Sequence, residues 1–206
     1  MSDATHAHDA VHRDDFGARL GMWLFLVTEI VLFGGLFIAY AYMRATYPAE
    51  FHHAGAELNA TLGVTNTVVL LTSSLTVVLS LVAIQRGDKV KTMAFLSTTL
   101  VLGVTFLVIK SFEWATKFHH GLYPNAPHLA TLPHGEQVFF GLYFTMTGLH
   151  GLHVIAGLSV LAYMLVKVAR EEIRQDQYVL LENGGLYWHL VDVIWIFLLP
   201  LFYLAA

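Results

Sequence analysis

Residues 138–166 decide the class of this protein, and they read VFFGLYFTMTGLHGLHVIAGLSVLAYMLV. The run contains no Asp, Glu, Lys or Arg, and its two histidines are the only side chains in it that could carry a positive charge. Its 29 residues exceed what a perpendicular α-helix needs to cross a hydrocarbon core of about 30 Å at about 1.5 Å per residue. We therefore expect a transmembrane helix that is tilted or that projects beyond the membrane.

Four further apolar segments accompany this one, at residues 20–43, 62–84, 93–109 and 183–206. Of the 206 residues, 56% are hydrophobic and 13% are charged, whereas an average soluble chain is about 25% charged. Five crossings and short loops account for the whole length, so no separate catalytic domain fits outside the membrane. The predicted fold class is all-α: a polytopic membrane bundle of five transmembrane helices.

Residues 1–18 are predicted to form a soluble tail, and residues 19–206 to form one membrane domain. The predicted helices of this domain cover about residues 19–43, 62–85, 91–118, 136–168 and 183–204. The tail is acidic and rich in histidine, without the basic segment or small-residue cleavage site of a signal peptide. We therefore expect the first helix to be retained.

Lysine and arginine placement predicts the orientation of the bundle. Eight of these residues fall in the tail and in the second and fourth loops: Arg13, Arg19, Arg86, Lys89, Lys91, Lys167, Arg170 and Arg174. Only Arg44 and Lys117 fall in the first and third loops. Because short inner loops carry the excess of basic residues, we expect the N-terminal tail inside and the C-terminus outside.

Composition also excludes several classes of function. The chain has no cysteine, which excludes disulfides, thiolate metal sites and cysteine nucleophiles. Its formal net charge of −4 provides no basic patch on the scale that nucleic acid requires. Three classes remain: an accessory subunit of a membrane complex, a small transporter or channel, and a membrane-embedded metalloenzyme.

Glu29 is the first residue that indicates chemistry. It lies about ten residues into its predicted helix, roughly 15 Å deep and so near the bilayer midplane. An ionisable side chain there costs on the order of 3 kcal/mol, so it must face protein, water or a partner. We expect a buried, neutral Glu29 that is packed against protein, either as a simple packing contact or as a proton-handling residue.

Two pairs of polar residues at i, i+3 spacing lie in other apolar segments. His150 and His153 share one helical face, as do His189 and Asp192. A metal or haem site would need several ligands that converge from different helices. We therefore favour interhelical hydrogen bonding, and we predict no catalytic, cofactor-binding or metal-binding residue in this chain.

Charged residues also occur in the third apolar segment. Lys110 and Glu113 are spaced i, i+3, and Lys117 follows the glutamate at i+4. In lipid we expect these charges to neutralise one another near the outer end of the helix. The predicted interhelical polar residues are His150, His153, His189, Asp192, Lys110, Glu113 and Glu182.

Further polar and aromatic residues predict how the helices pack. Asn66, Ser73 and Ser80 recur every seven residues, which predicts a polar stripe that faces a neighbouring helix. Trp188 and Tyr203 lie toward opposite ends of the last segment. Their positions predict that they belong to the aromatic belts at the two membrane interfaces.

Three longer motifs resemble those of subunit III of haem-copper cytochrome c oxidases. They are RLGMWLFLVTEI at residues 19–30, MTGLHGLHVIAG at residues 146–157 and YWHLVDVIW at residues 187–195. The resemblance covers the chain from Arg19 onward, in order and at matching spacing. The longer members of the family have seven helices, so this chain resembles the short, five-helix bacterial form.

The resemblance implies an accessory subunit without haem or copper, with both cofactors in partner subunits. Its partners would be phospholipids, the catalytic subunit I and other oxidase subunits, in a bacterial plasma membrane. The family supports proton uptake, protects the catalytic subunit during turnover and holds structural lipids. Glu29 matches its buried, carbodiimide-reactive carboxyl. Lys167 matches a basic position associated with a phospholipid headgroup, and Arg19 is a second candidate lipid contact.

The electron donor stays open between cytochrome c and quinol, because short members occur in both branches of the family. Subunit III of a quinol oxidase is therefore the first alternative. A small transporter and a metalloenzyme are weaker ones, since the chain shows neither internal repeats nor a dense set of ligands.

Overall fold

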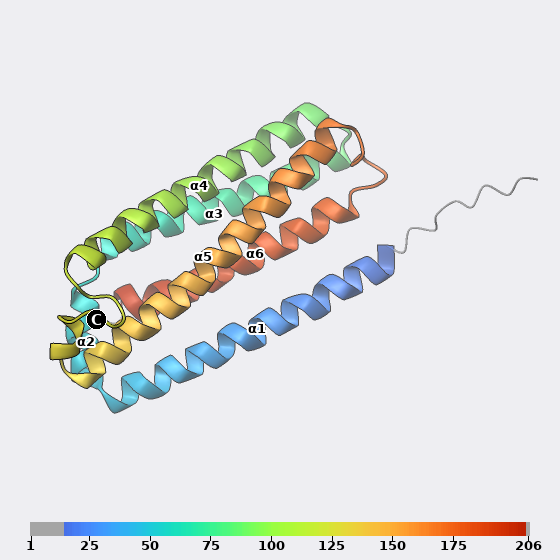
Figure 1. Ribbon diagram of the computed structural model, residues 1–206. Coiled ribbons are helices and arrows are strands. Elements are labelled where there is room, and N and C mark those ends of the chain that lie inside the picture. The colour runs from blue at the N-terminus through green and yellow to red at the C-terminus, as the bar shows by residue number, and fades with distance from the viewer. Residues whose placement is uncertain (1–14, 205–206) are drawn as a thin grey trace, which may run out of the picture.

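The computed structural model describes residues 15–204 as a bundle of helices joined by short connections (Figure 1). Five helices are long and apolar enough to cross a membrane: Asp15–Thr46 (α1), Ala60–Gln85 (α3), Lys89–His119 (α4), His134–Ala169 (α5) and Val179–Leu199 (α6). A π-helical turn, Pro200–Leu204 (η2), continues α6. The described residues contain no strand. The predicted all-α fold with five spans is therefore confirmed.

Two short helices lie in the connections at one end of the bundle (Figure 1). Pro48–Ala56 (α2) follows α1, and Leu129–Thr131 (η1) precedes α5. A proline at the start of α2 fits the first turn of a helix, where its missing N–H is not needed. Phe51 and Ala54 of α2 are buried, so this connection packs onto the bundle as a helix that the sequence analysis did not predict.

All five spans begin two to four residues earlier than predicted, and in two of them a side chain caps the start of the helix. Asn59 accepts a hydrogen bond from the backbone N–H of Leu62 at 3.2 Å, and α3 begins directly after it. Asp88 accepts from the backbone N–H of Lys91 at 3.0 Å, and α4 begins directly after it. Both caps satisfy N–H groups that have no partner within their own helix.

The five spans differ in how much of their surface the bundle covers. α6 is the most buried span and contacts α1, α3 and α5. α1 is the least buried and lies along one side of the bundle (Figure 1). Most of the α1 surface is therefore left for lipid or for a partner protein.

The polar stripe predicted on α3 faces the interior of the bundle. Asn66, Ser73 and Ser80 are all fully buried. Thr76, on the same helix, hydrogen-bonds Thr99 of α4 through the two hydroxyl groups at 2.7 Å. The prediction that this stripe faces a neighbouring helix is confirmed.

Three helices meet closely around the indole ring of Trp188 in α6. The ring is fully buried, and its N–H donates to Ser73 Oγ at 3.0 Å. A Cβ atom added to Gly103 or Gly157 would lie 2.9 or 2.8 Å from a carbon of this ring. The prediction that Trp188 lies in an interfacial belt is therefore wrong, and so is the same prediction for Tyr203, which is 5% exposed.

Candidate functional site

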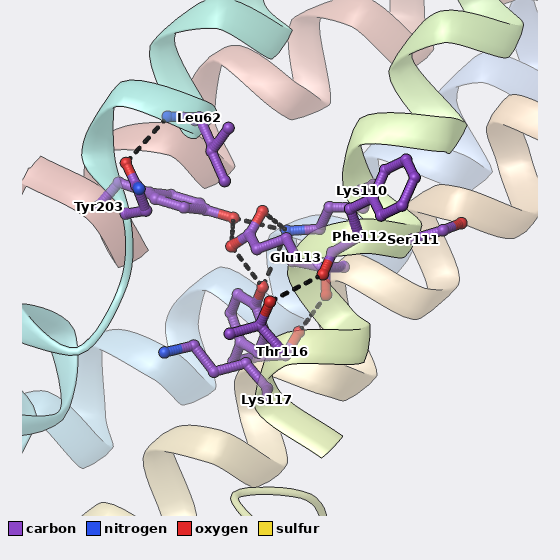
Figure 2. Close-up of polar contacts among 12 residues, drawn as sticks. Leu62, Lys110, Ser111, Phe112, Glu113, Thr116, Lys117 and Tyr203 are labelled. Atoms are coloured by element: carbon purple, nitrogen blue, oxygen red, sulfur yellow. Dashed lines mark hydrogen bonds and ion pairs between the residues drawn. The ribbon is translucent and has the colours of Figure 1, made fainter. Parts of the chain in front are cut away.

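A buried cluster of one lysine, one glutamate and two tyrosines lies between α4, α5 and η2 (Figure 2). Lys110 Nζ donates a hydrogen bond to Glu113 Oε2 at 3.2 Å. It also donates to the phenol oxygens of Tyr143 and Tyr203, at 3.0 and 2.5 Å. Both phenol groups donate in turn to Glu113 Oε1, at 2.8 and 2.6 Å. We call these four residues, none of which is more than 7% exposed, the Lys110 network.

The Lys110 network provides hydrogen-bond partners for a charge pair that is buried inside an apolar bundle. Two opposite charges attract strongly there, but removing them from water costs several kcal/mol per ion unless further hydrogen bonds replace the lost water. The two phenol groups supply these bonds. The lysine Nζ also lies 5.2 Å from the centre of the Trp195 ring, a cation–π distance. Lys117, which we expected to join the pair, instead donates to the backbone oxygen of Glu57.

Glu29 joins α1 to α5 through a contact with a histidine. Its Oε2 lies 2.8 Å from His153 Nε2, and the Glu29 side chain is 13% exposed. The other ring nitrogen, His153 Nδ1, lies 2.7 Å from the backbone oxygen of Leu149. A carbonyl oxygen can only accept, so Nδ1 carries a proton. The contact between Nε2 and Oε2 then requires one more proton, held by the ring or by the carboxyl group, and the pair has no net charge in either arrangement.

The other histidines of the predicted set lie apart from this pair. His150 is fully buried and stacks on Trp195 with ring centres 5.3 Å apart. His189 Nδ1 lies 2.5 Å from Ser74 Oγ, which links α6 to α3. Asp192 is buried on the next turn of α6.

The remaining predicted residues form ion pairs at the end of the bundle that carries the basic loops. Arg19 donates to Glu182 Oε2 from Nη2 at 2.8 Å and from Nε at 3.1 Å. This ion pair joins the start of α1 to the start of α6. Lys167, near the end of α5, pairs with Glu172 in the loop that follows. Both candidate lipid contacts are therefore already paired with a carboxylate.

Carboxyl groups in the loops at this end have lowered pKa values because each accepts a hydrogen bond from a lysine. They are Asp88 beside Lys91, Glu171 beside Lys89, and Glu172 beside Lys167. These three carboxyl groups therefore stay ionised to a lower pH than free carboxyl groups do. The pair of Glu171 and Lys89, at 3.0 Å, also connects the loop after α5 to the start of α4.

The structure does not gather the seven predicted polar residues into one cluster. Lys110 and Glu113 lie in the Lys110 network, and His153 pairs with Glu29. His189 and Asp192 lie one turn apart on α6, and His150 and Glu182 occupy two further places. Among residues 15–204, no three His, Asp or Glu side chains are arranged to hold a metal ion.

Sequence reasoning missed Tyr143, Tyr203 and Ser74. The two tyrosines lie 33 and 93 positions along the chain from Lys110. Ser74 lies 115 positions from its partner His189. Such contacts depend on how the helices pack, which local spacing does not reveal. One signal was available for the tyrosines: a phenol group inside an apolar segment needs a hydrogen-bond partner when it is buried.

Comparison with known proteins gives the family of this bundle. The family model described as cytochrome c oxidase subunit III matches residues 2–206. Cytochrome c oxidase subunit 3 of Thermostichus vulcanus is 31% identical over 202 residues, which cover 98% of this chain and 92% of that protein.

Two other relatives differ in their names and lengths. Cytochrome bo(3) ubiquinol oxidase subunit 3 of Pseudomonas aeruginosa is 28% identical, over 98% of this chain and 91% of that protein. Heme-copper oxidase subunit I+III of Aeropyrum pernix is 30% identical over 91% of this chain, but the chain spans 22% of that relative's length. A family match along almost the whole sequence, on a bundle of five membrane-spanning helices, shows that this chain belongs to the cytochrome c oxidase subunit III family.

Proposed function

We propose that this chain is the accessory, cofactor-free subunit III of a bacterial terminal oxidase, bound to the catalytic haem-copper subunit I in the plasma membrane. The match to the Aeropyrum protein carries this proposal. That protein is named subunit I+III, and this chain matches about a fifth of it. Two subunits that form one polypeptide in a relative are expected to contact each other when they are separate. Haem and copper would then belong to the partner subunits.

The pair of Glu29 and His153 supports a role in proton handling. The single shared proton can lie on the ring, which makes the pair an ion pair, or on the carboxyl group, which makes both partners neutral, and the net charge of the pair is zero in both cases. We propose that the pair supports proton uptake by the complex from the inner side of the membrane.

Purification of the tagged complex in mild detergent tests both statements. We expect a large haem-containing subunit to co-purify with this chain. We expect Glu29→Gln, which keeps the shape but removes the titratable group, to slow proton uptake by the complex several-fold. Glu182→Gln is the matched control, because it alters a carboxyl group near one end of the bundle and should leave the rate unchanged. A chain that purifies without a haem-containing partner would overturn the accessory role, and an unchanged rate in Glu29→Gln would overturn the proton role.

The ends of the bundle support an N-terminus on the inner side of the membrane. The ion pairs of Arg19 with Glu182 and of Lys89 with Glu171 bring basic residues from α1 and α4 to the same end. Basic residues concentrate on the inner side of membrane proteins. A periplasmic reporter fused to the N-terminus of the full chain should therefore be inactive, while one fused to the C-terminus should be active. The reverse pattern would show the opposite orientation.

Lys167 and Arg19 are proposed to contact anionic phospholipid headgroups at the inner leaflet. A cation at this depth attracts phosphate, although Glu172 and Glu182 compete with the lipid for it. We expect Lys167→Gln to reduce the anionic phospholipid retained by the purified complex, as measured by lipid mass spectrometry. Lys91→Gln, which alters a lysine in the first turn of α4 that is paired with Asp88, is the control.

A quinol oxidase is the second candidate for the complex. It is favoured by the match to the Pseudomonas aeruginosa ubiquinol oxidase subunit over 98% of this chain. Oxygen consumption by the purified complex, measured with reduced cytochrome c and with ubiquinol in turn, decides between the two donors.

A further inference from the structure

A pocket of about 380 Å³ opens at the end of the bundle that carries α2 and η1. Its walls include apolar side chains, among them buried Leu122 and Phe140. The other lining side chains carry imidazole or carboxylate groups: His53, Glu57, His120, His128 and Glu136. We call this the cap pocket. It shares no residue with the Lys110 network or with the pair of Glu29 and His153.

One carboxylate of the cap pocket is held in place by the fold. Glu136 lies in the first turn of α5 and is 7% exposed. Its Oε1 lies 3.0 Å from Nδ1 of His53, which reaches it from α2. The His53 side chain is 71% exposed. The pocket thus combines a fixed, almost buried oxygen donor with an accessible imidazole.

Two more imidazole groups are carried by the chain between α4 and α5. His120 follows the last residue of α4, and Gly121 comes next with a φ of +67°. A Cβ atom on this glycine would lie 3.1 Å from Cβ of His128. The tight turn at Gly121 therefore folds the chain back so that His120 and His128 line the same pocket. Both side chains are exposed.

We propose that the cap pocket binds a divalent transition-metal ion of the zinc class, held by imidazole nitrogens and by the Glu136 carboxylate. Zinc is bound in proteins by this combination of nitrogen and oxygen donors, whereas Ca²⁺ and Mg²⁺ prefer all-oxygen sites. Three donors do not yet converge on one point within residues 15–204. Binding therefore draws the exposed imidazole side chains toward the fixed carboxylate.

A bound ion would connect parts of the chain that are far apart in sequence. His53 comes from α2, His120 from the end of α4, His128 from the loop before η1 and Glu136 from the start of α5. The ion would hold these segments together where the helices leave the membrane. This inference goes beyond the proposed oxidase role and does not rest on it.

Zinc binding to the intact, chelator-washed complex tests the proposal. Bound zinc is measured by elemental analysis after equilibration with ZnCl₂, and its ligands by X-ray absorption at the zinc edge, which haem iron and copper do not obscure. We expect the triple variant His53→Ala, His120→Ala, His128→Ala to bind one zinc ion fewer per complex than the wild type. The matched control removes three histidines from the N-terminal tail instead: His6→Ala, His8→Ala, His12→Ala. It should keep the ion.

A milder variant separates the fixed carboxylate from the histidines. Glu136→Gln keeps the side-chain volume, and we expect it to weaken zinc binding at least tenfold. The proposal is overturned if the cap-pocket triple variant binds as much zinc as the wild type. It is also overturned if the loss of zinc follows the tail variant, or if the absorption spectrum shows no imidazole ligand.

Discussion

At the scale of single residues, the Lys110 network shows how a charge pair is accommodated in an apolar bundle. Both oxygens of the Glu113 carboxylate accept hydrogen bonds, and all three donors come from within the network. Breaking a buried pair by removing one charge leaves the other without compensation. The network should therefore tolerate the loss of both charges better than the loss of one.

We predict that Glu113→Gln lowers the free energy of unfolding by about 3–5 kcal/mol, because Lys110 stays buried beside a neutral amide. Tyr203→Phe removes two hydrogen bonds with charged groups, one accepted from Lys110 and one donated to Glu113, and should cost at least about 1.5–3 kcal/mol. The double variant Lys110→Met, Glu113→Leu should recover most of the stability that Glu113→Gln loses. Chemical unfolding in mixed detergent micelles measures all three. A double variant that is less stable than Glu113→Gln would contradict this account.

The sequence predicted the local half of this network and missed the distant half. The pairing of Lys110 with Glu113 follows from their spacing on one helix. Tyr203 was instead expected at the membrane interface, because an aromatic residue near the end of a span usually lies there. Its burial follows from the way α6 packs against α3 and α5 and η2 packs against α2 and α3, and Trp188 was misplaced for the same reason. Glu29 was predicted to be packed against protein, but its partner His153 on α5 could not be chosen from several histidines.

At the scale of helices, the bundle depends on two glycines that allow Trp188 to lie between α4 and α5. Hydropathy predicted the five spans because lipid requires long apolar helices with satisfied backbone groups. It gave no sign of α2, whose nine residues are too few to form an apolar run. Hydropathy also could not show which glycines lie against a neighbouring side chain, since that depends on how the helices pack.

We predict that Gly157→Ala lowers the free energy of unfolding by about 1–3 kcal/mol, because the new methyl group would overlap the rigid Trp188 ring. Gly151→Ala is the matched control on the same helix. A Cβ atom there would meet nothing within 4 Å, and alanine is the better helix former, so this variant should be neutral or more stable by about 0.5–1 kcal/mol. Equal effects of the two substitutions on unfolding would show that the ring does not limit the packing.

At the scale of the whole molecule, the end with the basic loops is held by exposed ion pairs, which predicts a response to acid. Asp88, Glu171 and Glu172 have pKa values lowered by their lysine partners. In the unfolded chain such carboxyl groups have a pKa of about 4, so the unfolded state takes up protons before the folded state does as the pH falls. Their stabilising contribution is therefore complete above that pH and is lost as the pH falls through the folded pKa values.

We predict that the unfolding temperature of the detergent-solubilised protein decreases below about pH 4, and that the decrease is smaller in the triple variant Asp88→Asn, Glu171→Gln, Glu172→Gln. Asparagine preserves the helix cap at position 88, so the comparison isolates the charges. The difference should be small, since exposed ion pairs contribute little. Intrinsic tryptophan fluorescence during heating measures it. The same acid response in both proteins would exclude these pairs as its source.

The position of Tyr203 also has a consequence for biosynthesis. Lys110 and Glu113 leave the ribosome 93 and 90 residues before this tyrosine, so the newly inserted α4 holds its charge pair in the membrane with an incomplete set of hydrogen bonds. The last phenol group arrives only when η2 has been translated. A chain that stops before η2 therefore keeps this charge pair with an incomplete set of hydrogen bonds, which gives a membrane protease a physical basis for recognising it.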